Sequence, residues 1–207
     1  MNKITIPNNM LQEATPLAVT LYSTISVYAK YAVTEESYLY MPREKLQYDL
    51  YGQNCKTTFM VKNILAGISE LEELKILKYN SDTKMVAIRR DAFWPDKYVG
   101  ILGAELSKIL TIGDPGYFQW LLFYYYCHII RSFSPYIVIE ERNNIIGTMA
   151  QSYFADLLDL NINTIRKYNK CLTENNLLYI AHVGNQKTNM YCRYEDRGLL
   201  KKYLKAT

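Results

Sequence analysis

The sequence predicts a mostly α-helical protein with short β-hairpins, arranged as two similar units in tandem. Three observations predict this fold class. Apolar residues recur at helical spacing along much of the chain, short stretches such as residues 84–89 alternate as strands do, and the order helix, helix, hairpin occurs in both halves. The length of 207 residues allows two small domains of about 100 residues each.

The first half begins with a predicted helix over residues 14–32. Thr15 is a candidate N-cap and Pro16 suits the first helical position, and apolar residues follow at spacings of three and four. Further helices are predicted over residues 42–50 and 58–74. Residues 75–90 then indicate two short strands around a turn at Ser81 and Asp82, so that three helices precede a hairpin.

An irregular stretch over residues 89–100, which includes Pro95, predicts the boundary between a domain at 1–94 and a domain at 95–207. The elements predicted after it are a helix at 104–110, an aromatic helix at 117–132, a strand at 135–140, helices at 149–160 and 161–176, a hairpin at 177–196 that turns near Gly184, and a basic helix from 197. The aromatic helix is apolar nearly all round, which indicates a buried core helix or, as an alternative, a subunit interface anchored by Trp120 and the tyrosines 124–126. Helices followed by a hairpin are the order of a winged helix-turn-helix, so two such units in tandem are expected.

Charge is unevenly distributed. Residues 161–207 contain nine Lys or Arg against three acids, whereas residues 1–160 contain fifteen against seventeen. A basic segment on an otherwise neutral chain favours a polyanionic partner, most often nucleic acid or a membrane surface. In the basic C-terminal helix, Arg197, Lys201, Lys202 and Lys205 either contact phosphates or keep the terminus solvated.

Several classes of site are not expected. The four cysteines, Cys55, Cys127, Cys171 and Cys192, lack the spacing of a zinc site or a disulfide framework and are predicted to be free thiols. Nucleotide-binding loops and hydrolase or metalloprotease motifs are missing from the sequence, so we predict no enzyme, no metal and no cofactor. The apolar run at 117–130 is too short for a membrane span, and the N-terminus lacks an apolar signal core, which predicts a cytoplasmic protein without membrane attachment.

The segment 152–172 predicts a helix-turn-helix. Phe154, Leu157 and Leu158 form the expected inward stripe of its first helix, and Asn161 is a good N-cap for the second. On a helical wheel of the second helix, Ile165, Tyr168, Cys171 and Leu172 share the packed side. In DNA-binding proteins of this kind the second helix lies in the major groove.

The outward side of that helix carries Asn163, Arg166, Lys170 and Thr173, and no acid occurs between Asn161 and Thr173. Arg pairs with guanine and Asn with adenine in the major groove, while the flanking Lys167 and Asn169 are expected at phosphates. The alternatives are a merely solvated face or a protein-interaction module. The candidate DNA-binding residues are Asn161, Asn163, Thr164, Arg166, Lys167, Asn169, Lys170, His182, Asn185, Gln186 and Lys187, with Gln53, Asn54, Lys56, Thr57, Lys62 and Lys84 in the first half.

The first half is the weaker candidate for DNA binding. Its third helix is cationic only at the start, near Lys62, and ends in Glu70, Glu72 and Glu73, which would repel phosphate. This unit is expected to contact DNA through its helix start and wing, or else to mediate dimerisation.

The order of elements resembles the N-terminal winged-helix domain of plasmid and phage replication initiators and of DnaD-like primosomal proteins. The segments that carry the resemblance are ITIPNNML, TPLAVTLYSTISVYAKYA, YLYMPREKLQYDL and NILAGISELEELKILKY. The resemblance implies tandem winged helices that face one DNA site, although the acidic SELEEL departs from this pattern. We therefore predict a duplex DNA-binding protein, a plasmid or phage replication initiator, with a homodimer and replication proteins as further partners. The alternatives are a transcription regulator of a mobile element and an adaptor without strong DNA binding.

Overall fold

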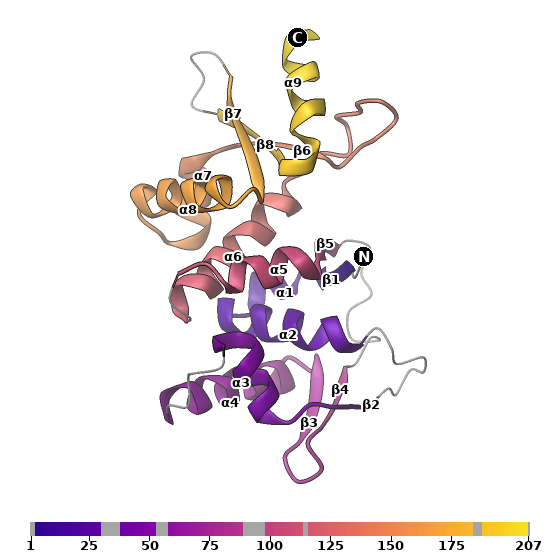
Figure 1. The fold of residues 1–207 in the computed structure, drawn as a ribbon, viewed down its shortest axis with the longest axis vertical. Coiled ribbons are helices and arrows are strands. Elements are labelled where there is room, and N and C mark those ends of the chain that lie inside the picture. Colours follow the sequence, from indigo (N-terminus) through magenta and orange to yellow (C-terminus); the bar gives the residue numbers. More distant parts are fainter. Residues whose placement is uncertain are drawn as a thin grey trace. The chain divides into compact units, whose positions relative to one another are not determined.

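The computed structural model describes residues 3–29, 38–52, 58–88, 98–113, 116–183 and 188–206. The protein is mixed and mostly helical with small antiparallel sheets, and it divides into two compact units, Met1–Tyr124 and Tyr125–Thr207 (Figure 1). The predicted class of helices with short antiparallel strands is thus confirmed.

The first unit contains β1 (Lys3–Pro7), α1 (Met10–Glu13), α2 (Pro16–Ala29), β2 (Tyr38–Tyr40), α3 (Arg43–Tyr51), α4 (Thr58–Glu73), β3 (Leu77–Asn80), β4 (Met85–Ile88), β5 (Tyr98–Leu102), α5 (Gly103–Leu110) and the start of α6 (Tyr117–Arg131). Helices α2, α3 and α4 pack on one another, and the second of its two sheets has the strand order β2-β4-β3 (Figure 1). The predicted helices and the hairpin of the first half are confirmed.

The start of α2 follows the sequence prediction closely. The helix begins at Pro16, and the hydroxyl of Thr15 accepts a hydrogen bond from the Ala18 amide at 3.3 Å. Glu70 of α4 adds a second interaction, because its carboxylate accepts both the amide and the hydroxyl of Thr15 at 2.6 Å. An acid beside a helix N-terminus is favourable for the helix dipole, so Glu70 stabilises the packing of α2 on α4.

The predicted domain boundary at residues 94 and 95 is wrong. Strand β5 pairs antiparallel with β1, from Lys3 opposite Leu102 to Pro7 opposite Tyr98. This pairing makes residues 98–102 part of the first unit, and the division falls instead within α6, after Tyr124. Contacts between strands so distant in sequence leave no local signal, whereas the irregular stretch before β5 resembles a linker.

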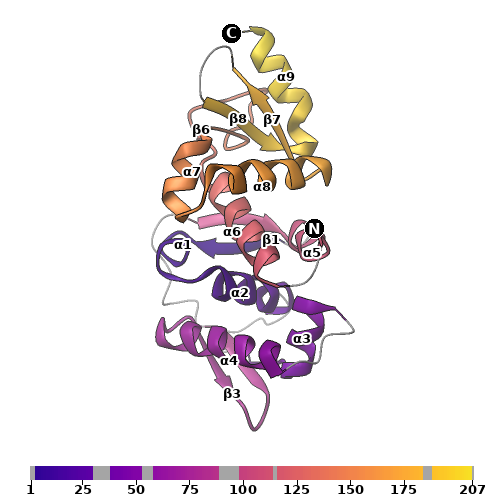
Figure 2. The same cartoon turned by 90° about the vertical axis from the view of Figure 1, so that its left-hand side faces the viewer.

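The second unit contains the rest of α6, then β6 (Ile146–Ala150), α7 (Gln151–Leu158), α8 (Ile162–Glu174), β7 (Leu178–His182), β8 (Thr188–Arg193), a 3-10 turn at Tyr194–Asp196 and α9 (Arg197–Ala206). Its sheet has the order β6-β8-β7, with every pair antiparallel. Helix α9 lies against this sheet (Figure 2), where Leu200 joins a core that includes Ile146, Met190 and Cys192.

The strand predicted at 135–140 is also wrong. Only an isolated bridge joins Ile139 to Arg142, around Glu140 and Glu141, whose φ angles of 48° and 63° make a tight turn. Tyr136 is 91% exposed, so the apolar residues of this segment do not pack on a sheet as the predicted strand requires. The first strand of the sheet is β6, which begins six residues after the predicted strand ends and pairs over its full length with Thr188–Cys192 of β8.

Gly147 in β6 lies so close to Ser132 that a side chain at this position would clash. A Cβ at this position would lie 2.6 Å from Ser132 Oγ and 3.1 Å from the Ser132 carbonyl oxygen. Gly147→Ala is expected to destabilise the protein by about 1–3 kcal/mol, the usual cost of overpacking. Urea denaturation of Gly147→Ala with and without Ser132→Ala checks this, because removing the hydroxyl should recover part of the loss. Strictly additive losses would contradict the proposed clash.

Helix α6 is mainly a core element. Trp120, Tyr125 and Tyr126 are buried, and the hydroxyl of Tyr124 donates to the Leu11 carbonyl at 2.6 Å. The core interpretation is therefore confirmed, and a subunit interface anchored by these side chains is wrong because three of the four are covered within the chain. Within the described ranges, no helix reaches both the length and the hydropathy that a membrane span requires.

Candidate nucleic-acid interface

The turn between α7 and α8 is fixed by local interactions. Asp159 ends α7 in the left-handed region, with φ 50° and ψ 48°, and the Leu160 amide donates to the Ala155 carbonyl at 2.9 Å. Asn161 then caps α8, because its side-chain oxygen accepts from the Asn163 amide at 2.8 Å. The predicted cap is confirmed. The side-chain oxygen of Asn161 therefore has a structural role at the start of α8.

The packed side of α8 agrees with the helical wheel. Ile165, Tyr168 and Leu172 are buried, and Cys171 is half-buried. In α7, Phe154 is buried as expected, but Leu157 is 45% exposed and does not belong to the inward stripe. Phe154 and Ala155 form the buried side of the short α7, and Leu157 lies on its solvent side.

Asn169 does not have the predicted position beside the outward face. Its side chain is only 6% exposed, and its oxygen accepts a hydrogen bond from the Tyr125 hydroxyl at 2.7 Å. A buried phenol requires a polar partner, and Asn169 supplies one from the packed side of α8. The expectation that Asn169 flanks the face at phosphates is therefore wrong, and its role is structural.

The other cations and amides of α8 are on its surface. Asn163, Arg166, Lys167, Lys170 and Thr173 are exposed, and Thr164 is half-buried. Arg166 donates to the Asn163 side-chain oxygen at 3.1 Å, which holds the guanidinium near the start of the helix. Lys170 lies 3.8 Å from Glu174 in a pair exposed to solvent on both sides, so this pairing is weak.

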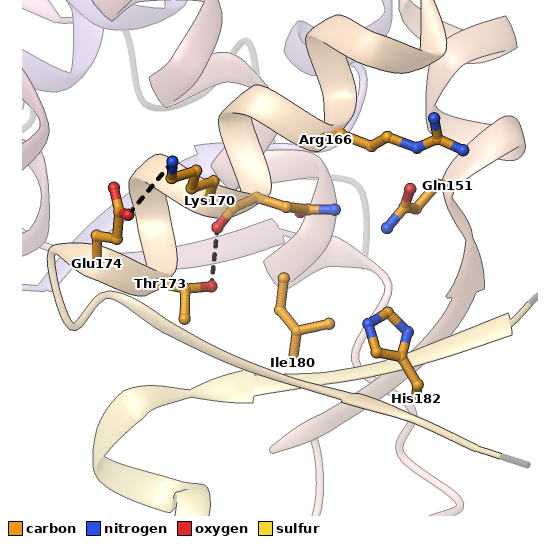
Figure 3. A pocket seen from close by; sticks show the side chains of 8 residues that line it. Gln151, Arg166, Lys170, Thr173, Glu174, Ile180 and His182 are labelled. Carbon is orange, nitrogen blue, oxygen red and sulfur yellow. Dashed lines mark hydrogen bonds and ion pairs between the residues drawn. The ribbon is translucent and has the colours of Figure 1, made fainter.

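A hollow of about 360 Å³ lies between α8 and β7. In Figure 3 the amide of Gln151 lies between the guanidinium of Arg166 and the ring of His182, while Lys170 and Glu174 stand on the opposite side. The lining residues are Gln151, Arg166, Asn169, Lys170, Thr173, Glu174, Ile180 and His182. Arg166, Lys170 and Thr173 of the predicted outward side of α8 thus line the same hollow as His182 of the predicted hairpin.

Glu174 of α8, together with Gln151 and Ile180, lines the hollow without having been predicted to be functional. Gln151 starts α7 immediately after β6, whereas the predicted helix at 149–160 runs through this junction. Ile180 belongs to β7 and supplies an apolar floor. The residue types of Gln151 and Ile180 carry no signal for a site, because their place there depends on the pairing of β6 and β7 with β8.

The remaining candidate residues are scattered or lie outside the described residues. Lys62 is exposed on α4, and Lys84 is half-buried in the β3-β4 turn, where its carbonyl accepts the Met41 amide at 2.8 Å. The candidates that lie outside the described residues are Gln53, Asn54, Lys56 and Thr57, together with Asn185, Gln186 and Lys187.

Three of the four cations of α9 have contacts within the second unit. Lys202 is 2.5 Å from Glu140, Arg197 stacks 4.2 Å from the centre of the Tyr194 ring, and Lys201 lies 5.4 Å from that of Tyr179. These contacts connect α9 to neighbouring loops and to β7. They favour the solvating and packing role of this helix over phosphate binding.

Buried hydroxyls support the hollow from within. The Tyr191 hydroxyl accepts from the Asn189 side-chain nitrogen at 3.2 Å, and the Tyr125 hydroxyl donates to the Asn169 side-chain oxygen at 2.7 Å. Burial raises the pKa of both phenols above the ordinary value near 10. Burial also raises the pKa of the Cys192 thiol to about 12 and makes it unreactive.

Alkaline pH is expected to destabilise the second unit. Because the folded-state pKa of each phenol is raised, the stability that they contribute is complete below about pH 10 and is lost as the pH rises toward the folded-state value. Between pH 8 and pH 11 the melting temperature should therefore fall more steeply with pH in the wild type than in Tyr125→Phe. Equal slopes would mean that Tyr125 does not cause this dependence.

Comparison of the chain with protein-family models, curated proteins and solved structures gave no significant match.

Proposed function

We propose that this protein binds duplex DNA with sequence preference, chiefly through α8. The observation that carries the proposal is the exposed surface of this helix, where Asn163, Arg166, Lys167 and Lys170 stand without an acid between Asn161 and Thr173. The Asn161 cap and the buried Ile165 and Leu172 orient this surface. Major-groove recognition requires such a protruding, donor-rich helix.

The order of elements supports winged helix-turn-helix units as the fold. In each unit a strand precedes two helices and a hairpin, and that strand pairs with the last strand of the hairpin, in the orders β2-β4-β3 and β6-β8-β7. The β7-β8 hairpin is then the wing, and α8 is the recognition helix.

In the first unit the corresponding helix is α4. Two of the three acids that would repel phosphate there have structural contacts, since Glu70 accepts from Thr15 and Glu72 accepts from the Tyr79 amide at 2.8 Å. The exposed start of α4 carries Lys62 together with Phe59, which is 69% exposed. A cation beside an exposed aromatic ring suits either a secondary DNA contact or dimerisation.

Replication initiation on a plasmid or phage, in the cytoplasm, is the role that the resemblance favours. Selection of bound sites from a random duplex library tests both the binding and the role. A selected motif with direct repeats supports an initiator, and a palindrome supports a transcription regulator. Recovery of no motif, with weak binding that does not respond to salt, would contradict the proposal and favour an adaptor.

Arg166 is expected to read one base. Arg166→Ala should reduce discrimination at a single position of the selected site by about 1–3 kcal/mol, because a guanidinium makes two hydrogen bonds with guanine. Anisotropy titrations with the four base variants at each position measure this. Arg131 at the end of α6 provides a control, since Arg131→Ala should lower no positional preference. A uniform loss at every position would instead assign Arg166 to a phosphate.

A further inference from the structure

One wall of the hollow differs chemically from the others. His182 is exposed on β7, and in Figure 3 one of its ring nitrogens is turned toward the other lining side chains. Behind the ring, Nδ1 lies 2.5 Å from the side-chain oxygen of Asn189, which is buried on β8. The buried Asn189 side chain therefore fixes the position of the imidazole.

The buried partners determine which ring nitrogen carries the proton. The Asn189 side-chain nitrogen donates to the Tyr191 hydroxyl at 3.2 Å, so the Asn189 oxygen is the atom that faces the imidazole. An amide oxygen only accepts, and Nδ1 must donate to it. In the neutral ring Nε2 then has a lone pair and no hydrogen.

We propose that His182 presents Nε2 to the hollow as an acceptor and recognises the exocyclic amino group of adenine or cytosine. This inference rests on the proposed DNA binding. Phosphate oxygens are acceptors and cannot pair with a bare Nε2. In the major groove guanine and thymine also offer only acceptors, whereas adenine N6 and cytosine N4 are donors. Arg166 supplies donors to the same hollow, so His182 adds the complementary selectivity.

Asn189 is accordingly a positioning residue that acts through His182. The chain has only two histidines, His128 and His182, so protein labelled with ¹⁵N-histidine gives two ring systems in a long-range ¹H–¹⁵N spectrum. His182→Gln assigns them by removing one. At about pH 8.5, where an ordinary imidazole is neutral, His182 is expected as the Nδ1–H tautomer.

Two substitutions at Asn189 sharpen the spectroscopic test. Asn189→Asp keeps an acceptor oxygen and should retain the Nδ1–H tautomer, whereas Asn189→Leu should lose it. An Nε2–H tautomer in the wild type would overturn the inference. The wild-type spectrum alone decides this point if Asn189→Leu does not fold.

The DNA contact is tested by removing single amino groups from the selected site. Each adenine is replaced in turn by purine and each cytosine by 2-pyrimidinone, and binding is compared between the wild type and His182→Phe. One replacement should weaken wild-type binding about threefold to tenfold, as expected for one hydrogen bond, and should have no effect on His182→Phe.

The possible failures are distinguishable. If the wild type binds no duplex, both the proposed function and the DNA contact of His182 are overturned. If it binds DNA but no replaced amino group is coupled to His182, only the inference about His182 is overturned.

Discussion

Replacing Lys167 and Lys170 together by alanine is expected to weaken binding to all duplexes on the order of a hundredfold near physiological salt. Both side chains are exposed on α8, and the solvent-exposed Glu174 competes only weakly for Lys170. A hydrogen bond to a charged group contributes about 1.5 kcal/mol or more, so the loss of two accounts for this factor. Because lysines at phosphates carry no sequence information, the relative affinities of different sites should persist.

The salt dependence provides the diagnostic measurement. Each phosphate contact contributes about 0.9 to the slope of log K against log salt, and the double variant should therefore lose nearly two units of slope. Lys75→Ala with Lys108→Ala is the matched control, because both side chains are exposed in the first unit and the net charge changes equally. A full slope in the α8 variant, or an equal loss in the control, would place the phosphate contacts elsewhere.

Helices α7 and α8 and the turn between them could be predicted from the sequence because their determinants are local. Asn161 caps the helix that follows it, and Ile165, Tyr168 and Leu172 recur at the spacing of one helix face. Such relations lie within one or two turns of a helix. They do not depend on how the rest of the chain folds.

The errors concern residues whose position depends on distant partners. Asn169 is polar and is therefore expected at the surface, but Tyr125, forty-four residues earlier, holds its side-chain oxygen in the interior. Strand β5 belongs to the first unit only because it pairs with β1. No spacing within either segment contains this information.

The hollow itself illustrates the same limit. Arg166, Lys170 and Thr173 could be placed on one face by the helical wheel, but their meeting with Gln151 and His182 depends on the order β6-β8-β7. Asn189 carries no motif, and its importance follows only from its contact with His182 across the hairpin. Sequence reasoning thus finds the helix surface, and the sheet determines which side chains surround the hollow beside it.

Phe154→Ala is expected to cost about 3–5 kcal/mol, a large part of the stability of a domain of this size. Phe154 is completely buried in α7, and its ring contacts Tyr125 at 5.3 Å and Tyr191 at 5.9 Å in edge-to-face geometry. These tyrosines also carry the hydrogen bonds to Asn169 and Asn189. The cavity would therefore loosen both the packing of α8 and the support of His182.

The neighbouring ring provides the control for this prediction. Tyr153 also contacts Phe154, at 5.6 Å, but is 46% exposed, so Tyr153→Ala should cost less than about 1 kcal/mol. Urea denaturation gives both values, and the histidine spectrum reports whether the Nδ1–H tautomer survives in conditions where Phe154→Ala is still folded. A loss below about 1 kcal/mol in Phe154→Ala would mean that the aromatic cluster does not organise the second unit. A large loss with an unchanged tautomer would mean instead that β7 and β8 orient His182 independently of α7.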